Sequence, residues 1–546
     1  MYTCTSGEIV ERFPDRYLAI WPSPIETVPL LHYTPGGRYL LLSTLGCNLS
    51  CPGCVSHILV NNPDLITEAM SQASSEEILH RVSEHSCLGA VFCLNEPTVS
   101  IETVIKTSQT LREAGYKVGC ASNGCMSPSI LDRFLATMDF MNIGMKGSSD
   151  EVYQECGAPC NIEHVFDTIQ QVHTAGVHLE ISVVYQHGRE QEAIGVAERL
   201  SEISLNIPLH IMRFIPFGEV DADLEPSPDE AEALLSSCRH FLRWVYLFNT
   251  PGTGRLSTFC PDCETILIER SFYGPMGARL TDRIEHTQCI CGVEVPISGS
   301  FSRSQGSEPR YRGGYRTSVI LSSVANTLHL LGVRDSQVVS RILVKILSGR
   351  WLEDLQGYFS SPEGYIEYIR ILSSFAGIEG KVQPLIGFYL HRLEEIQVIM
   401  LQAPRPRVYC ALSHPFLPSY PDKMEVSLTE RAGGEVLNYQ IPHDESCVEL
   451  FTQDQFNLLQ PDVIICSGMG KSDLQTFLDH CRQEYLIAPA LENGMVFCIP
   501  REYSSAGLFW ILVLEFLVNA LHPVRPLYDL AEEEASLMAI LSDLQS

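Results

Sequence analysis

The sequence predicts an α/β protein in which a partial (β/α)6 barrel is followed by a second α/β domain. Its 546 residues exceed the roughly 250–300 at which a single core stops growing, so at least two domains are expected. From about residue 38 onward, short apolar runs alternate with amphipathic helical stretches. The alternation repeats about six times, which implies parallel strands joined by right-handed crossovers.

Each predicted strand is a short run rich in β-branched or apolar residues, and each predicted helix carries an apolar stripe. The strands are expected at residues 38–44, 89–94, 116–121, 140–145, 178–185, 209–215 and 244–248. The helices between them are expected at residues 74–85, 101–115, 127–138, 161–176, 190–204 and 227–242. Because chemistry in βα barrels takes place at the carboxyl ends of strands, the segment after the first strand is the place to look for a site.

Composition and charge exclude several classes of function. The formal net charge of -29 would repel a phosphate backbone, so a nucleic-acid partner is not expected. The longest apolar stretch, Leu508 to Leu521, is shorter than the ~20 residues of a membrane span and contains Glu515 and Asn519. It predicts a buried amphipathic helix and no membrane span.

The expected oxidation state of the cysteines depends on the compartment. The first residues, MYTCTSGEIVERFPDRYLAIW, lack the basic and then apolar segments of a signal peptide, so we expect a cytoplasmic protein. The chain has 20 cysteines, and in a reducing compartment these should be free thiols, so that spaced clusters favour metal over disulfides.

Three cysteines follow the first predicted strand with the spacing C-x3-C-x2-C: Cys47, Cys51 and Cys54. Three thiolates on one loop can bind three irons of a [4Fe–4S] cluster and leave the fourth iron open to a substrate, whereas structural zinc is normally closed by four ligands. A zinc knuckle that borrows its fourth ligand from elsewhere is the alternative.

The cysteines and several other segments, in order, resemble the radical S-adenosylmethionine (SAM) superfamily. These segments are "SPIETVPLLHYTPGGRYLLLSTLGCNLSC", "LNEPTVS", "SNGC", "NIGMKGSSDEVYQECG", "LHIMRF" and "CPDCETILIER". Residues from Trp21 to about Gly292 are most similar to AmmeMemoRadiSam-system proteins and pyruvate formate-lyase activases. The resemblance implies a radical SAM barrel, and a [4Fe–4S] cluster whose unique iron is chelated by SAM. One-electron reduction by an external donor such as flavodoxin or ferredoxin would cleave SAM to methionine and a 5'-deoxyadenosyl radical.

The resemblance also implies roles for residues at the strand ends. Glu96 would accept a hydrogen bond from the SAM ammonium, in a loop framed by Asn95 and Thr98. The SAM carboxylate would meet Ser122, Asn123 and Lys146. Glu180 and Ser182 would hydrogen-bond the ribose, and His210 and Arg213 would contact SAM or substrate.

Each of these residues also has an ordinary structural interpretation. Glu96 could cap a helix, and Asn123 could belong to a plain Asn-Gly turn. Lys146 could be a solvated lysine. Glu180 with Ser182 could be a satisfied polar pair, and His210 with Arg213 could form structural ion pairs.

Three positions depart from the family pattern. Gly53 stands before the last cluster cysteine, where relatives carry an aromatic residue that touches adenine, so that contact must come from elsewhere. Gly144 replaces an acid that in relatives helps to hold a metal cation beside SAM. The cysteine-rich start of many relatives is reduced to Cys4.

A second set of cysteines indicates another metal site. Cys260 and Cys263 precede Cys289 and Cys291, and two close thiolate pairs across such a loop suit zinc or iron. A zinc ribbon near residues 258–292 is the first interpretation. A second iron–sulfur cluster, a site in which His286 is a ligand, and unliganded thiols are the alternatives.

The composition changes after this ribbon. Residues 298–316 are rich in Gly, Ser and Arg and predict a linker between a domain at 1–297 and one at 317–546. The later segments "SVILSSVANTLHLLGV", "LLQPDVIICSG" and "LENGMVFCIP" resemble the substrate-binding proteins that serve transporters of siderophores, haem and cobalamin. Their first lobe would be shortened here, since Val344 to Arg392 reads as helix, and the second lobe would span about 405–546. His414, Tyr420, Arg501 and Tyr503 are candidate ligand contacts.

Together these features predict a cytoplasmic radical SAM enzyme whose partial (β/α)6 radical SAM barrel is followed by an α/β substrate-binding-protein-like domain. That domain would present a substrate such as a tetrapyrrole, corrinoid or metal chelate. One alternative is an activase that installs a glycyl radical on a protein partner. Another is a metal-chelate binding or delivery protein without catalytic activity.

Overall fold

The structure of the chain is a computed structural model. It describes all residues except 1, 6, 61–66, 68–69, 217–219, 251–252, 273–276, 303–313, 349–354, 356, 413, 442–450, 468–472, 501–502, 504–506, 524–526 and 546. The chain divides into two compact units, Met1–Ser322 and Ser323–Ser546, and each is described by itself.

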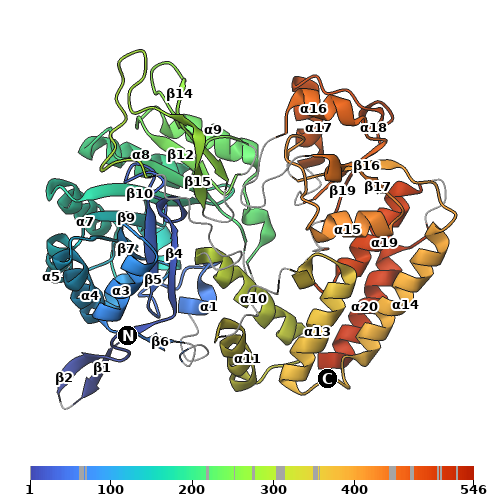
Figure 1. Cartoon of the computed structure of the whole chain (residues 1–546), viewed down its shortest axis with the longest axis horizontal. Coiled ribbons are helices and arrows are strands. Elements are labelled where there is room, and N and C mark those ends of the chain that lie inside the picture. The colour runs from blue at the N-terminus through green and yellow to red at the C-terminus, as the bar shows by residue number, and fades with distance from the viewer. Residues whose placement is uncertain are drawn as a thin grey trace. The chain divides into compact units, whose positions relative to one another are not determined.

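The N-terminal unit is built on an eight-stranded sheet with the order β12-β11-β10-β9-β8-β7-β5-β4 (Figure 1). Its strands are β4 (Ala19–Pro24), β5 (Arg38–Ser43), β7 (Gly89–Phe92), β8 (Lys117–Ser122), β9 (Phe140–Met145), β10 (His178–Tyr185), β11 (Leu209–Arg213) and β12 (Val245–Phe248). From β5 to β12 neighbouring strands are parallel, and β4 is antiparallel to β5. The predicted partial (β/α)6 barrel is confirmed, and the strand expected at 244–248 is β12, the seventh parallel strand.

Amphipathic helices connect the parallel strands and cover one side of the sheet (Figure 1). They are α3 (Ser75–Glu84), α4 (Ile101–Glu113), α5 (Pro128–Thr137), α6 (Asp150–Glu155), α7 (Ile162–Thr174), α8 (Glu190–Ile203) and α9 (Pro228–Cys238). A short α1 (His57–Val60) follows the loop that carries Cys47, Cys51 and Cys54, which we call the cysteine loop. Capping boxes start α3 and α9, where Ser74 and Ser227 exchange hydrogen bonds with the third helical residue. The buried faces of these helices join strand residues such as Leu42 and Phe92 in one core.

Smaller sheets and short helices complete this unit. An antiparallel ribbon of β13 (Thr258–Phe259), β14 (Ile266–Phe272) and β15 (Ala278–Glu285) shares a core with Met212, Trp244 and Tyr246 of the barrel edge. The other elements are a hairpin of β1 (Tyr2–Thr5) and β2 (Glu8–Glu11), a pair of β3 (Arg16–Tyr17) and β6 (Ser71–Gln72), and the 3-10 helices η1 (Ile25–Thr27), η3 (Pro97–Ser100) and η4 (Ala222–Leu224).

The C-terminal unit begins with helices and continues as a small parallel sheet. The helices are α10 (Gly314–Leu330), α11 (Ser336–Ser348), α13 (Pro362–Ala376) and α14 (Gln383–Met400). The sheet has the order β17 (Glu435–Val436), β16 (Arg407–Ala411), β18 (Val463–Cys466) and β19 (Val496–Cys498). Around it lie α15 (Met424–Arg431), η5 (Leu437–Gln440), α16 (Gln453–Leu459), α17 (Asp473–Gln483), α18 (Pro489–Glu492), α19 (Trp510–Leu521) and α20 (Leu530–Gln545).

Two expectations about this part of the chain can be compared directly with the structure. The apolar stretch at 508–521 forms α19, whose Glu515 is fully buried and lies 3.0 Å from the Arg392 guanidinium, so a carboxylate is tolerated there. Most of the predicted linker, residues 303–313, lies outside the described residues, and the two units divide within α10. In the part of the chain that the structure describes, no helix is long and apolar enough to cross a membrane.

Candidate active site

A cavity of about 410 Å³ lies where the parallel strands of the barrel end. That volume is within the range of cofactor and substrate sites. The cysteine loop after β5 and residues at the ends of β7, β8, β9, β10 and β11 line it. Of the predicted site residues, the cavity brings together Cys47, Cys51, Cys54, Asn95, Glu96, Ser122, Asn123, Lys146, Ser182 and Arg213.

The three cysteines lie on one loop that its own backbone folds. Gly46 precedes Cys47 with φ of 92°, a left-handed conformation that glycine adopts without strain. The Cys54 N–H then donates to the Cys51 carbonyl at 3.3 Å, and the Cys54 carbonyl accepts from His57 N–H at 2.9 Å. This donor set, three thiols facing one cavity, fits a cubane cluster with an open iron.

The surroundings of the three thiols differ. Burial raises the pKa of Cys47 to about 12 and also raises the pKa of Cys54. The pKa of Cys51 is lowered to about 6, first because its sulfur hydrogen-bonds with Cys156 and then because Lys146 lies nearby. Cys51 is therefore the loop sulfur whose thiolate form the protein favours most.

Hydrogen bonds to the Cys47 sulfur come from both its own loop and the residue that follows β8. The Leu49 N–H donates to this sulfur at 3.3 Å, and the Asn123 amide donates at 3.7 Å. Asn48 orients that amide, because its Oδ1 accepts from Asn123 Nδ2 at 2.7 Å. Such donors stabilise sulfur that carries negative charge, as it would when bound to iron.

Glu96 is a buried carboxylate that ties two strand ends together. Its oxygens accept from Thr98 N–H at 3.2 Å, Asn123 N–H at 2.8 Å and the Ser122 hydroxyl at 2.9 Å. It therefore caps η3, as its structural interpretation predicted, and also lines the cavity. Burial raises the pKa of Glu96, and an ammonium ligand would compensate the cost of its charge.

Asn95 braces the two loops that meet above β5 and β7. Its Oδ1 accepts from Thr44 N–H at 3.0 Å, and its Nδ2 donates to the Gly46 carbonyl at 3.1 Å. The preceding residue, Leu94, has φ of 75°, an uncommon conformation for a branched side chain. The end of β7 is thus held in a strained conformation directly at the cavity.

Lys146 lies after β9 among the cluster cysteines. Burial lowers the pKa of this amine, but the groups of Cys51, Tyr153 and Cys156 outweigh it, so the pKa of Lys146 is raised. The side chain is half-buried and lines the cavity. It is therefore a positive charge beside the Cys51 sulfur and not a solvated surface lysine.

Glu180 and His210 were expected to contact SAM or substrate, but neither lines the cavity. Glu180 is near the amino end of β10, two residues below Ser182, and both of its oxygens are occupied. One accepts from His32 N–H at 2.8 Å and lies 2.9 Å from His178 Nε2. The other accepts from Leu31 N–H at 2.9 Å and lies 2.8 Å from His210 Nε2. Burial disfavours its charge, but the hydrogen bonds of the two histidines outweigh this and hold the pKa of Glu180 well below its usual range.

Ser182 and Arg213 do reach the cavity, each with a partner already in place. The Ser182 hydroxyl donates to Asn142 Oδ1 at 2.8 Å. The Arg213 guanidinium donates to Glu225 at 2.7 Å and to the Asn249 carbonyl at 2.9 Å. Arg213 thus anchors the loop after β11, which was its structural interpretation, while its side chain forms part of the wall.

Phe214 occupies the space that Gly53 leaves. A Cβ atom placed on Gly53 would come within 2.5 Å of the Phe214 ring, and Gly53 has φ of 67°. Phe214 lines the same cavity from the end of β11. An aromatic ring therefore lies beside the last cluster cysteine, although it comes from a different strand.

Gly144 leaves room beside Lys146. A Cβ at this position would lie 3.6 Å from Lys146 Nζ and 3.7 Å from the Ser182 hydroxyl. An acidic side chain at this position would therefore lie next to the lysine ammonium.

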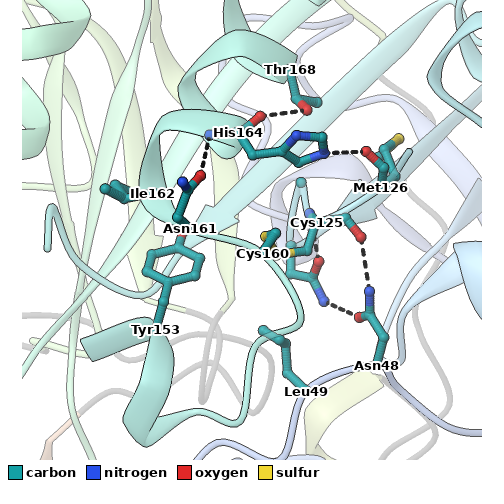
Figure 2. Close-up of a disulfide and its surroundings, with 12 residues drawn as sticks. Asn48, Leu49, Cys125, Met126, Tyr153, Cys160, Asn161, Ile162, His164 and Thr168 are labelled. Atoms are coloured by element: carbon teal, nitrogen blue, oxygen red, sulfur yellow. Dashed lines mark hydrogen bonds between the residues drawn. A yellow bond between two sulfur atoms is a disulfide. The ribbon is translucent and has the colours of Figure 1, made fainter. Parts of the chain in front are cut away.

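A disulfide joins Cys125 and Cys160, which corrects the expectation that all cysteines are reduced (Figure 2). It links the loop after β8 to the connection between α6 and α7, two segments whose proximity depends on the fold. The Asn48 amide donates to the Cys125 carbonyl at 2.8 Å, and His164 Nε2 lies 2.6 Å from the Met126 carbonyl (Figure 2). The hydrogen bond from Asn48 to the Cys125 carbonyl therefore connects the disulfide to the cysteine loop.

The second cysteine set converges to one point in the ribbon. The sulfurs of Cys260, Cys263, Cys289 and Cys291 all lie within 4.8 Å of one another. A Zn–S bond of about 2.3 Å places tetrahedral sulfurs about 3.8 Å apart, so these thiols fit one metal ion. His286, the alternative ligand, is not a member of this group.

In the C-terminal unit the candidate ligand contacts have separate surroundings. The rings of His414 and His480 lie 4.7 Å apart, and burial lowers the pKa of His414 to about 4. The Tyr503 hydroxyl donates to Glu534 at 3.2 Å. Tyr420 is half-buried, and Arg501 lies outside the described residues.

Sequence reasoning did not single out Cys156, Asn142 and Phe214, which also line the cavity. Asn142 is on β9 and Phe214 directly follows β11, so the rule of strand ends could have found them. Cys156 lies within the segment NIGMKGSSDEVYQECG, ten residues after Lys146. The sequence signal for Cys156 was therefore its place in a segment that already carried the site residue Lys146.

Comparison with known proteins gives one family match. Residues 41–200 match the model of the radical SAM superfamily. An uncharacterized protein of Methanocaldococcus jannaschii is 29% identical over 282 residues, which cover 50% of this chain and 82% of that protein.

Several solved structures of binding proteins are similar to a part of the chain. An ABC transporter solute binding protein from Sulfurospirillum deleyianum is 18% identical with a TM-score of 0.28, over 33% of this chain and 57% of that one. The TroA-like periplasmic binding protein FepB from Veillonella parvula is 16% identical with a TM-score of 0.29, over 34% and 59%. The periplasmic vitamin B12 binding protein BtuF of Vibrio cholerae is 13% identical with a TM-score of 0.25, over 30% and 62%. This chain thus spans less than two thirds of these structures, and likeness at this level decides neither fold nor ligand.

Proposed function

Since residues 41–200 of this chain form a radical SAM domain, we propose that the protein is an enzyme that holds a [4Fe–4S] cluster on Cys47, Cys51 and Cys54 and binds SAM beside it. The observation that supports this most is that one cavity gathers these three thiols with the carboxylate of Glu96 and the amine of Lys146. The cluster and SAM, when bound, would supply reductive cleavage of SAM and a radical that removes a hydrogen atom from a substrate.

The residues of the cavity have complementary tasks in this proposal. Lys146 offsets the charge of the thiolates and pairs with the SAM carboxylate, while Glu96 accepts from the ammonium. Ser122 and Asn123 hold the Glu96 carboxylate in place. Apolar side chains such as Leu49, Met212 and Phe214 in the cavity wall limit access of water to the reaction.

We further propose that the C-terminal unit presents the substrate, a tetrapyrrole, corrinoid or metal chelate. The sequence resemblance to binding proteins supports this, and so does the parallel sheet β17-β16-β18-β19, since open parallel sheets bind ligands beyond their carboxyl ends. His414 follows β16 at such an end, with His480 beside it.

The remaining parts of the proposal concern metal, electron source and compartment. The four ribbon cysteines would bind zinc, because their sulfurs converge as a closed set of four ligands. An external flavodoxin or ferredoxin would deliver the electron. A reducing cytoplasm would keep the thiols outside the Cys125–Cys160 disulfide available for metal.

Anaerobic reconstitution tests the proposal. The protein is loaded with iron and sulfide, then reduced in the presence of SAM, and 5'-deoxyadenosine is measured by mass spectrometry. We expect product from the unchanged chain and from Cys238→Ala, whose buried thiol lies outside the cavity. Cys47→Ala and Cys54→Ala should lose at least about 100-fold in rate, because each removes a cluster ligand.

A formed cluster without any 5'-deoxyadenosine would overturn the enzymatic proposal. Addition of cobalamin or haemin to the same reaction tests the substrate class. The rate should rise when the substrate is present, since substrate binding commonly completes the active site of an enzyme. An unchanged rate with both compounds would contradict a tetrapyrrole or corrinoid substrate.

A further inference from the structure

A fourth cysteine, Cys156, lies at the cavity that the three loop cysteines line. Cys156 caps the C-terminus of α6 and is 7% exposed. It lines the cavity together with Cys47, Cys51 and Cys54. The spacing that predicted the cluster did not include this residue, because it follows Cys54 by more than a hundred positions.

The backbone fixes Cys156 against the cysteine loop. Its carbonyl accepts from Ser50 N–H at 2.8 Å, directly beside Cys51. The next residue, Gly157, has φ of 64°, and a Cβ there would come within 2.7 Å of the Ser50 hydroxyl. Only glycine permits this close approach, so the segment that carries Cys156 is held to the loop that carries the ligands.

The thiol of Cys156 lines the same cavity as the sulfur of Cys51. Cys156 is also the neighbour that does most to lower the pKa of Cys51, and Lys146 acts on both thiols. A sulfur that binds iron is a thiolate and can only accept a hydrogen bond. In the loaded protein the donor in this pair must therefore be the S–H group of Cys156.

We propose that Cys156 is a positioning residue of the cluster site, whose S–H group donates a hydrogen bond to the Cys51 sulfur and thereby sets the reduction potential of the cluster. The inference rests on the proposed function. Hydrogen bonds to cluster sulfurs are among the factors that determine the potential. The reduced cluster carries one more negative charge, so a donor stabilises it more than the oxidised cluster. Loss of the donor should lower the potential and make reduction harder.

Redox titration of the reconstituted protein, followed by EPR of the reduced cluster, measures this effect. Cys156→Ala should shift the reduction equilibrium about tenfold toward the oxidised cluster, which is about 59 mV for a one-electron couple. Cys156→Ser keeps an O–H donor at the same position and should restore most of the shift. Cys238→Ala, another buried thiol, lies outside the cavity and should leave the potential unchanged.

Iron and sulfide content measured on the same samples separates the possible failures. Equal potentials for the unchanged protein and Cys156→Ala, with full clusters in both, would overturn the role of Cys156 and leave the proposed function intact. If the unchanged protein formed no cluster, both proposals would fall. If Cys156→Ala does not assemble, the serine variant decides. A potential close to that of the unchanged protein supports the hydrogen bond, and a potential about 59 mV lower contradicts it.

Discussion

The Phe214 ring lies against the backbone of Gly53, which directly precedes Cys54. The aromatic side chain and the glycine come from different parts of the chain, but they share one cavity wall. A larger residue at position 53 would displace the ring, so the two positions are coupled. We therefore expect the Phe214 ring to stack on adenine when SAM binds as proposed.

We expect Phe214→Ala to weaken SAM binding about tenfold, because stacking of a base on an aromatic side chain contributes about 1–3 kcal/mol. Isothermal titration of SAM into the anaerobic, cluster-loaded protein measures the affinity. Phe214→Tyr keeps the ring and should bind nearly as well as the unchanged protein. Gly53→Ala should weaken binding as well, since its Cβ would come within 2.5 Å of the ring.

Methionine provides the matched control ligand because it lacks the adenine. Its affinity should be the same for Phe214→Ala and for the unchanged protein. A variant that loses affinity equally for SAM and methionine would contradict stacking and indicate general damage to the cavity.

At the scale of single residues, the sequence predicts the cavity well at strand ends and poorly elsewhere. Glu96, Asn123 and Lys146 each follow a strand, and each lines the cavity. Glu180 does not line the cavity although Ser182 on the same strand does, since alternation along a strand gives the face of a residue but not its depth. Glu180 lies two positions nearer the amino end of β10 than Ser182, and its carboxylate accepts from four donors in the barrel interior.

The connection between α6 and α7 is an element that supports the site from outside. Its Cys156 holds the cysteine loop, and its Cys160 holds the loop after β8 through the disulfide (Figure 2). Asn48 links both sides, since it donates to the Cys125 carbonyl and accepts from Asn123. The connection is therefore expected to limit movement of the loops that surround the cavity.

Cys160→Ala should lower the thermal unfolding temperature by several degrees. The disulfide spans 35 residues, and closing a loop of that size corresponds to roughly 3–4 kcal/mol in the chain-entropy account. Scanning calorimetry under non-reducing conditions measures the change. Cys87→Ala serves as the control, because it removes a buried thiol that is not part of a disulfide.

Alkylation followed by intact mass measurement tests whether the bond is present. Protein purified without reductant should leave Cys125 and Cys160 unmodified under denaturing alkylation. Modification of both would restore the initial expectation of free thiols and contradict the stabilising role.

The strands and helices of the barrel were predictable because hydrophobic periodicity is a local property. The predicted strands 140–145 and 178–185 coincide with β9 and β10. The disulfide and β4 were not predicted, for a different reason. β4 pairs with β5 through backbone hydrogen bonds, and Cys125 meets Cys160 only after α5, β9 and α6 between them have folded. Such pairings between distant segments leave no periodic signal in the sequence.

At the scale of the whole N-terminal unit, the ribbon closes the edge of the barrel. Cys260 and Cys289 belong to the same core as Leu31, Trp244 and Tyr246, while Cys263 and Cys291 are exposed. A metal on the four sulfurs would therefore fasten the loop between β13 and β14 to the segment after β15, beside the core that they share with β12. Its loss would expose apolar surface of the barrel edge as well as loosen the ribbon.

Removal of this metal should destabilise the N-terminal unit as a whole. Substitution of the exposed ligands, Cys263→Ser with Cys291→Ser, leaves the core residues in place and should abolish zinc measured by elemental analysis. We expect an unfolding temperature lower by about 10 °C or more, because structural zinc contributes several kcal/mol to folding. A chelator should lower the unfolding temperature of the unchanged protein in the same way and have little effect on the double variant. Iron with sulfide in place of zinc would instead identify a second cluster, and equal unfolding temperatures in all samples would show that the four thiols fold without a metal.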